Sequence, residues 1–119
     1  MICIYIRTKH FCDLIMSGQK TIETRNSNTL DRFLYQTVGI ILTGCGKPKL
    51  IGTVKITGAL LMDQKTFRAF QNQHCVLPGS RYDIKGAHKI GYTLSNPVRL
   101  PEAIELEPVK GNRIWRCVE

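Results

Sequence analysis

Three charged side chains in one short segment, Lys20, Glu23 and Arg25, are the residues of this sequence best placed to do chemistry. They follow Gly18, a typical helix stop, on a stretch that predicts a strand. Residues two apart share a face of a strand, so Glu23 and Arg25 point the same way, while Lys20 at the strand entrance can turn toward them. Two cations around a carboxylate can hold a phosphate and accept hydrogen bonds from a base or sugar.

The same three residues also fit a plainer arrangement. On a solvent-exposed strand face, Glu23 and Arg25 would form a surface ion pair worth under about 1 kcal/mol. A concave pocket shared by all three residues would distinguish a binding cleft from such a face. We predict a cleft, flanked by the polar loop of residues 26–36 as a candidate lid.

A short helix must position this segment. Phe11, Leu14 and Ile15 recur at the i, i+3, i+4 spacing that turns one apolar stripe toward the core. Thr8 is a suitable N-cap and Gly18 a suitable stop, which predicts about two helical turns. Alternating residues over 2–6 predict a half-buried strand before this helix.

The rest of the chain predicts mainly short strands. Segments 38–42 and 50–57, joined by a glycine- and proline-containing turn, predict an antiparallel hairpin. Asp63 can cap a second helix that carries Phe67 and Phe70 on one face. Residues 75–87 are expected to be irregular.

Three more strands are predicted, over residues 90–94, over residues 98–106 with a continuation past Pro101, and over residues 114–118. With six or seven mostly antiparallel strands and two short helices, the predicted class is α+β, in one domain over residues 1–119. So many short strands favour a closed or nearly closed barrel, which removes exposed edges.

Composition and charge restrict the partners. The chain has 119 residues and a net charge of +8, which favours polyanions such as nucleic acid. Its five cysteines lack CxxC spacing and are expected to be reduced core thiols. The His10–Cys12 and His74–Cys75 pairs are too sparse for a metal site, so we predict none. We expect these histidines to be surface or capping residues. No apolar run is long enough to span a bilayer, so we expect a cytosolic protein without a membrane segment. We also expect no cofactor.

The pattern Gly-x-Lys-x-x-Glu-x-Arg, carried by Gly18, Lys20, Glu23 and Arg25 behind an amphipathic helix, resembles the signature of ASCH domains. Later apolar strands, the segment 91–94, two prolines and residues 110–115 follow in the order that family shows, so the resemblance covers nearly the whole chain. It implies a PUA-like β-barrel with a cleft proposed to bind RNA, in a family where a few members are nucleoside amidohydrolases or ribonucleases.

One position departs from the amidohydrolase branch that the chain resembles. That branch has a threonine, its proposed nucleophile, where this sequence has Glu23, so only Lys20 and Arg25 carry over. A carboxylate there could instead act as a general base, with Lys20 stabilising a developing anion.

Three further residues are candidate ligand contacts. Lys47 and Lys49 could touch a backbone phosphate, and Tyr92 could either stack on a base or pack in the core. The other aromatic residues that could stack are Tyr35, Tyr82 and Trp115, with core packing favoured for Trp115. The sequence thus predicts binding of single-stranded RNA or a nucleotide-like ligand. The alternatives are a small hydrolase using Lys20 and Glu23 as acid and base, and a protein interaction module.

Overall fold

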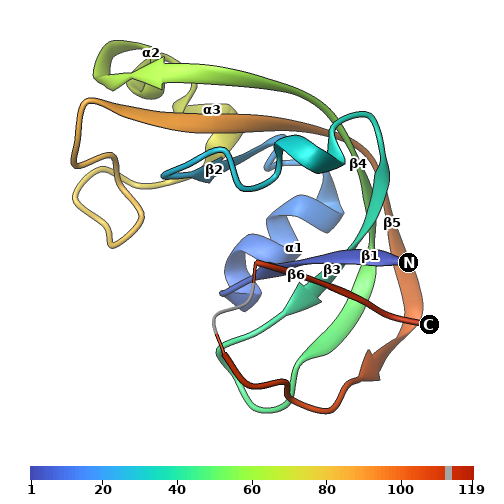
Figure 1. Ribbon diagram of the computed structural model, residues 1–119. Helices are drawn as coiled ribbons and strands as arrows, with labels where there is room; N and C mark the ends of the chain where they lie inside the picture. Colours follow the sequence, from blue (N-terminus) through green and yellow to red (C-terminus); the bar gives the residue numbers. More distant parts are fainter. Residues whose placement is uncertain (112–113) are drawn as a thin grey trace.

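The computed structural model describes residues 1–111 and 114–119, which form one mixed sheet with short helices packed on it (Figure 1). Asn112 and Arg113, part of the C-terminal segment that resembles ASCH domains, lie outside the described residues. The elements in chain order are β1 Ile2–Ile6, α1 Lys9–Ser17, β2 Ile22–Arg25, the 3₁₀ helix η1 Asp31–Phe33, β3 Thr37–Leu42, β4 Lys49–Asp63, α2 Gln64–Ala69, α3 Gln71–His74, β5 His88–Glu105 and β6 Trp115–Cys117.

The six strands of the described residues pair in the order β2-β5-β4-β3-β1-β6. Within this sheet β1 and β3 run parallel, and the other neighbouring strands run antiparallel. The predicted α+β class and the mostly antiparallel pairing are therefore confirmed. A closed barrel is not confirmed, because β2 and β6 stand at the two ends of this order.

The two long strands β4 and β5, which α2, α3 and a loop separate in the chain, form the longest antiparallel pairing of the sheet (Figure 1). The hairpin predicted from segments 38–42 and 50–57 is present as β3 and β4. The break predicted between the strands over 90–94 and 98–106 is wrong, since β5 runs continuously through Pro97, whereas the predicted continuation past Pro101 is confirmed. Register shifts along the β4–β5 pairing absorb the bends that would otherwise end the strand, and Asn96 adopts a left-handed φ of 55° beside the first proline.

Helix α1 has the predicted ends. The Thr8 side chain accepts a hydrogen bond from the Phe11 backbone N–H, and Gly18 has the left-handed φ of 84° that ends the helix. Ile15 of the predicted stripe is buried, together with Cys12 and Met16, whereas Phe11 and Leu14 are only partly buried. Phe11 thus lies at the edge of the core, beside the site. No helix of the described residues is long and apolar enough to cross a membrane.

A second apolar cluster supports β2 from the side of α2 and α3. Ile22 packs there with Met62, Phe67 and Val76, and Asp63 caps α2 as predicted by accepting from the Thr66 backbone N–H. The predicted lid is held more firmly than a mobile loop, because it contains η1 and buries Leu30 and Phe33 in the main core. Among residues 26–36, Asn26 is the one that lines the pocket of Lys20, Glu23 and Arg25.

The five cysteines are free thiols. Cys3 and Cys12 are buried as expected, and burial raises the pKa of the Cys12 thiol to about 12. Cys45 and Cys117 are exposed, so the expectation that all five are core residues is wrong.

Candidate functional site

The three residues singled out in the sequence come together in one pocket of about 200 Å³. This central pocket lies where the end of β1, α1, β2 and the loop before β5 meet. Lys20, Glu23 and Arg25 line it, and Asn26 extends the wall into the loop that follows β2. The alternative of a solvent-exposed strand face is therefore excluded.

Glu23 is the centre of the charge arrangement. Its Oε2 accepts a hydrogen bond from Arg25 Nε at 3.0 Å, and its Oε1 lies 3.7 Å from Lys20 Nζ. Its side chain is only 11% exposed, so the carboxylate is held by its partners and not by bulk water. Arg25 also donates from Nη2 to the Tyr5 backbone carbonyl at 2.8 Å, which fixes β2 against β1. The carboxylate is thus a rigid acceptor in the pocket.

Lys20 is more deeply buried than the sequence suggested. Only 1% of the residue is exposed, its Nζ donates to the His74 backbone carbonyl, and it lies 4.6 Å from the centre of the Phe11 ring. Burial lowers the pKa of Lys20, while the charge of Glu23 opposes that shift. Lys20 therefore forms the floor of the pocket and offers almost no surface for a direct phosphate contact.

Lys89 is a fourth charged member of the site that the sequence reading missed. It is 6% exposed, lines the central pocket, and donates from Nζ to the Tyr82 backbone carbonyl at 2.7 Å. Burial lowers its pKa, and Glu23 acts in the opposite direction. Exposed Arg7, at the end of β1, adds another cation to the rim. Lys89 reaches Glu23 through the pairing of β5 with β2, and Arg7 follows β1, which does not pair with β2. No local pattern could therefore have identified either residue.

Tyr82 lines the central pocket, and Tyr92 does not. Tyr92 is fully buried, its hydroxyl donating to Asp31 at 2.6 Å and accepting from the Leu30 backbone N–H at 3.3 Å. Burial, followed by the Asp31 contact, raises the pKa of Tyr92 to about 12. Of its two predicted roles, core packing is the one that this geometry supports. Half-buried Tyr82 and Phe11 line the pocket, with their rings edge to face at 5.5 Å.

Lys47 and Lys49 do not line the central pocket. They belong to the β3–β4 turn and the start of β4, at the lower end of the sheet in Figure 1, whereas β2 lies in its upper half. Lys47 instead pairs with Glu107 at 3.4 Å on the surface. A phosphate contact of these lysines would be separate from the pocket.

His74 supports the floor of the pocket from below. It is fully buried, contrary to the expectation of a surface or capping histidine, and stacks on Phe67 with ring centres 4.0 Å apart. Its Nδ1 accepts from the Val76 backbone N–H at 2.9 Å, so the neutral ring carries its proton on Nε2 and donates it to the Phe67 carbonyl at 2.7 Å. The backbone carbonyl of the same residue holds Lys20. A neutral His74 thus positions the buried ammonium.

We expect the stability of the protein to fall as the pH drops below about 6.5, the ordinary pKa of histidine. Burial lowers the pKa of His74 in the folded state, so the unfolded chain binds more protons between the two pKa values, and acid favours unfolding there. Urea unfolding between pH 5 and pH 8 should show this loss in the wild type. His74→Gln should be less stable at pH 8 and nearly independent of pH over this range.

Exposed His10 provides the matched control. His10→Gln should retain the wild-type pH dependence. The carboxylates with lowered pKa values, Asp13, Asp63 and Asp83, titrate at lower pH and do not contribute to this window. An equal loss of stability in His74→Gln and the wild type would contradict the assignment.

Comparison with known proteins gives a consistent result for the fold. No protein-family model and no curated protein matches the sequence. Three crystal structures of an ASCH protein from Zymomonas mobilis match almost the entire chain. The wild type is 18% identical with a TM-score of 0.78, covering 99% of this chain and 87% of that one. A serine-to-alanine mutant of that protein is 18% identical with a TM-score of 0.79, and the match covers 99% of this chain and 87% of that one. A tyrosine-to-phenylalanine mutant is 17% identical with a TM-score of 0.80, and the match covers 99% of this chain and 89% of that one. The chain therefore has the ASCH-domain fold that its sequence pattern predicted.

Proposed function

We propose that this protein binds single-stranded RNA and inserts one nucleotide unit into the central pocket. The observation that carries the proposal is the concentration of cations around one buried carboxylate: Arg7, Lys20, Arg25 and Lys89 line the same pocket as Glu23. Among the described residues that line it, Glu23 is the only acidic one. The net positive charge attracts a phosphate backbone, and the structural neighbours carry the ASCH name, which is consistent with this proposal.

In this proposal, different pocket residues contact the base and the sugar-phosphate chain. Glu23 presents carboxylate oxygens that accept hydrogen bonds from the amino or imino groups of a base. Tyr82 offers a ring edge or face for contact with that base, worth about 1 to 3 kcal/mol if the base stacks. Arg7 and Arg25 contact the sugar-phosphate chain. The volume of about 200 Å³ is below the roughly 300 to 1,000 Å³ of typical ligand pockets, which suits a single base-sized group.

Binding of a labelled single-stranded RNA, followed by fluorescence anisotropy at low salt, tests this proposal. Arg7→Ala should weaken binding to all sequences about equally, by roughly three- to tenfold, because it removes one phosphate contact. Arg7 is exposed and makes no ion pair among the described residues, so the fold should survive, as circular dichroism would verify. Lys55→Ala removes an equal charge from the surface outside the pocket and should have little effect.

Equal affinity of the wild type, Arg7→Ala and Lys55→Ala would show that general surface charge, and not the pocket, binds the RNA. No binding by the wild type would contradict the proposal and favour a protein interaction module.

One observation favours a hydrolase as the second candidate function. A buried lysine beside a carboxylate, both lining a pocket, is an arrangement that suits proton transfer, and burial lowers the pKa of Lys20. Incubating acetylated cytidine and a labelled RNA separately with wild type and Glu23→Gln, with chromatography of the products, tests it. Turnover that disappears in Glu23→Gln would place catalysis ahead of binding, and absence of product from both would leave binding as the function.

A further inference from the structure

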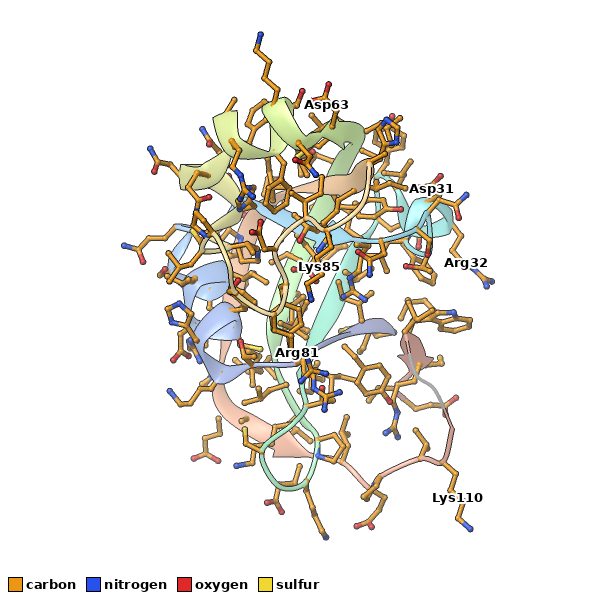
Figure 2. All side chains as sticks on the ribbon, turned by 90° about the vertical axis from the view of Figure 1, so that its left-hand side faces the viewer. Asp31, Arg32, Asp63, Arg81, Lys85 and Lys110 are labelled. Carbon is orange, nitrogen blue, oxygen red and sulfur yellow. The ribbon has the colours of Figure 1, made fainter. Side chains whose placement is uncertain are left out.

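A second basic pocket of about 310 Å³ adjoins the central pocket. Its lining includes the exposed cations Arg81 and Lys85 on the loop between α3 and β5, together with His88 at the start of β5. Figure 2 shows Arg81 and Lys85 on the same face of the molecule. Asn26, Tyr82 and Lys89 line both pockets, so the two cavities share a wall. We refer to this second cavity as the outer pocket.

The one carboxylate among the described residues of the outer pocket is already fully engaged. Asp83 receives two hydrogen bonds from Arg68, at 2.7 and 3.1 Å, and one each from the backbone N–H groups of Gly79 and Ile84, both at 2.8 Å. These donors hold the pKa of Asp83 well below its usual range, so the carboxylate stays ionised and its charge is balanced by Arg68. Asp83 therefore stabilises the conformation of the loop.

The cations of the outer pocket lack such partners. Among the described residues, neither Arg81 nor Lys85 forms an ion pair with a carboxylate, and Lys85 Nζ donates only to the Arg81 backbone carbonyl, at 3.1 Å. Arg81 lies over Tyr82, with its Cζ 5.6 Å from the ring centre, so the cation and the aromatic ring are neighbours at the junction of the two pockets. The outer pocket therefore presents two cations without ion pairs among the described residues, on a loop that Asp83 and Lys89 hold in place.

We propose that the outer pocket binds the phosphate group attached to the nucleoside that occupies the central pocket. The assignment rests on the proposed function, since it requires a nucleoside in the central pocket. The shared wall of Tyr82 and Lys89 places the two subsites side by side, which suits a base and phosphate joined through one ribose. Arg81 supplies a planar fork of donors and Lys85 a point charge, the two side chains that proteins use for phosphate. The ligand class is thus a nucleotide or an RNA strand, and a free nucleoside fills only half of the site.

Titration calorimetry with the four ribonucleosides and their 5′- and 3′-monophosphates tests this assignment. For the nucleoside that binds best, one of its two monophosphates should bind the wild type roughly tenfold more tightly or better, as expected for a charge-assisted contact. The double variant Arg81→Ala/Lys85→Ala should lose this gain and retain wild-type affinity for the nucleoside. Lys55→Ala/Lys65→Ala removes the same charge from exposed positions outside both pockets and should keep the gain.

The outcomes separate the two proposals. If nucleoside and monophosphates bind the wild type with equal affinity, or if the gain survives in Arg81→Ala/Lys85→Ala, the phosphate site is refuted while the proposed function stands. If both control and outer-pocket variants lose the gain equally, the effect is one of general charge and the assignment is overturned. If neither nucleosides, monophosphates nor single-stranded RNA bind, the proposed function itself fails.

Discussion

Glu23→Gln is expected to lower the free energy of unfolding by about 3 to 5 kcal/mol at pH 7, the usual cost of removing one partner of a buried ion pair. The substitution leaves Lys20 charged and 1% exposed, with only the His74 carbonyl and the Phe11 ring as neighbours. It also removes the carboxylate that orients Arg25. Urea unfolding monitored by circular dichroism would measure the loss.

The pH dependence of this loss identifies its cause. Without Glu23 the folded-state pKa of Lys20 falls further, because the attraction that opposes burial is gone. The unfolded chain then binds more protons between that pKa and about 10.5, so the variant regains stability as the pH rises through this range. The deficit relative to wild type should therefore shrink toward pH 10.

Two companion variants make the result specific. Lys20→Met/Glu23→Gln removes both charges and should recover much of the stability, since a buried pair can be replaced by uncharged residues at little cost. Glu102→Gln changes an exposed carboxylate and should stay within about 0.5 kcal/mol of wild type. A Glu23→Gln protein as stable as Glu102→Gln would contradict the account of the buried pair.

The affinity of the wild type for single-stranded RNA should fall roughly 20- to 50-fold between 50 and 200 mM monovalent salt. Of the Lys and Arg residues that line the two pockets, Arg7, Arg25, Arg81 and Lys85 are accessible to phosphates, whereas Lys20 and Lys89 are buried and already bonded to backbone carbonyls. Three to four contacts on a single strand give a slope of log affinity against log salt of about −2 to −3. Anisotropy titrations at four or five salt concentrations would measure it.

The slope of log affinity against log salt also indicates how many phosphate contacts each variant loses. Arg7→Ala should reduce its magnitude by about 0.7, the share of one phosphate on a single strand, and Lys55→Ala should leave it unchanged. Affinity that is independent of salt in the wild type would mean that the basic pockets do not contact phosphate at all.

The features that the sequence predicted correctly depend on residues close together in the chain. Thr8 and Asp63 cap their helices within three residues, and Gly18 ends α1 through its own left-handed backbone. The meeting of Glu23 and Arg25 follows from the alternation of side chains along β2. Lys20 lies two residues before β2 and reaches the same pocket from there. These relations need no knowledge of the tertiary structure.

The features that the sequence did not predict depend on which strands pair and in which register. Tyr92 lies opposite Glu23 in the β2–β5 ladder, and its burial follows from the core beneath that position. Lys89 reaches the pocket because β5 pairs with β2, and Tyr82 reaches it because the loop before β5 folds back toward β2. A separation of more than 55 residues between Glu23 and Tyr82 leaves no local signal of this contact.

The position of β1 between β3 and β6 has a consequence for how the chain assembles. Met1 and Val118 exchange backbone hydrogen bonds, at 2.7 and 2.8 Å, and the two ends lie near each other in Figure 1. During synthesis β1 emerges first, yet its pairing with β6 must wait until residues 115–117 leave the ribosome. Until then one side of β1 carries unpaired backbone groups that another nascent chain could bind. The residues that the β1–β6 ladder joins lie 111 to 115 positions apart, so its closure carries a larger loop-closure entropy cost than the pairing of strands close in the chain.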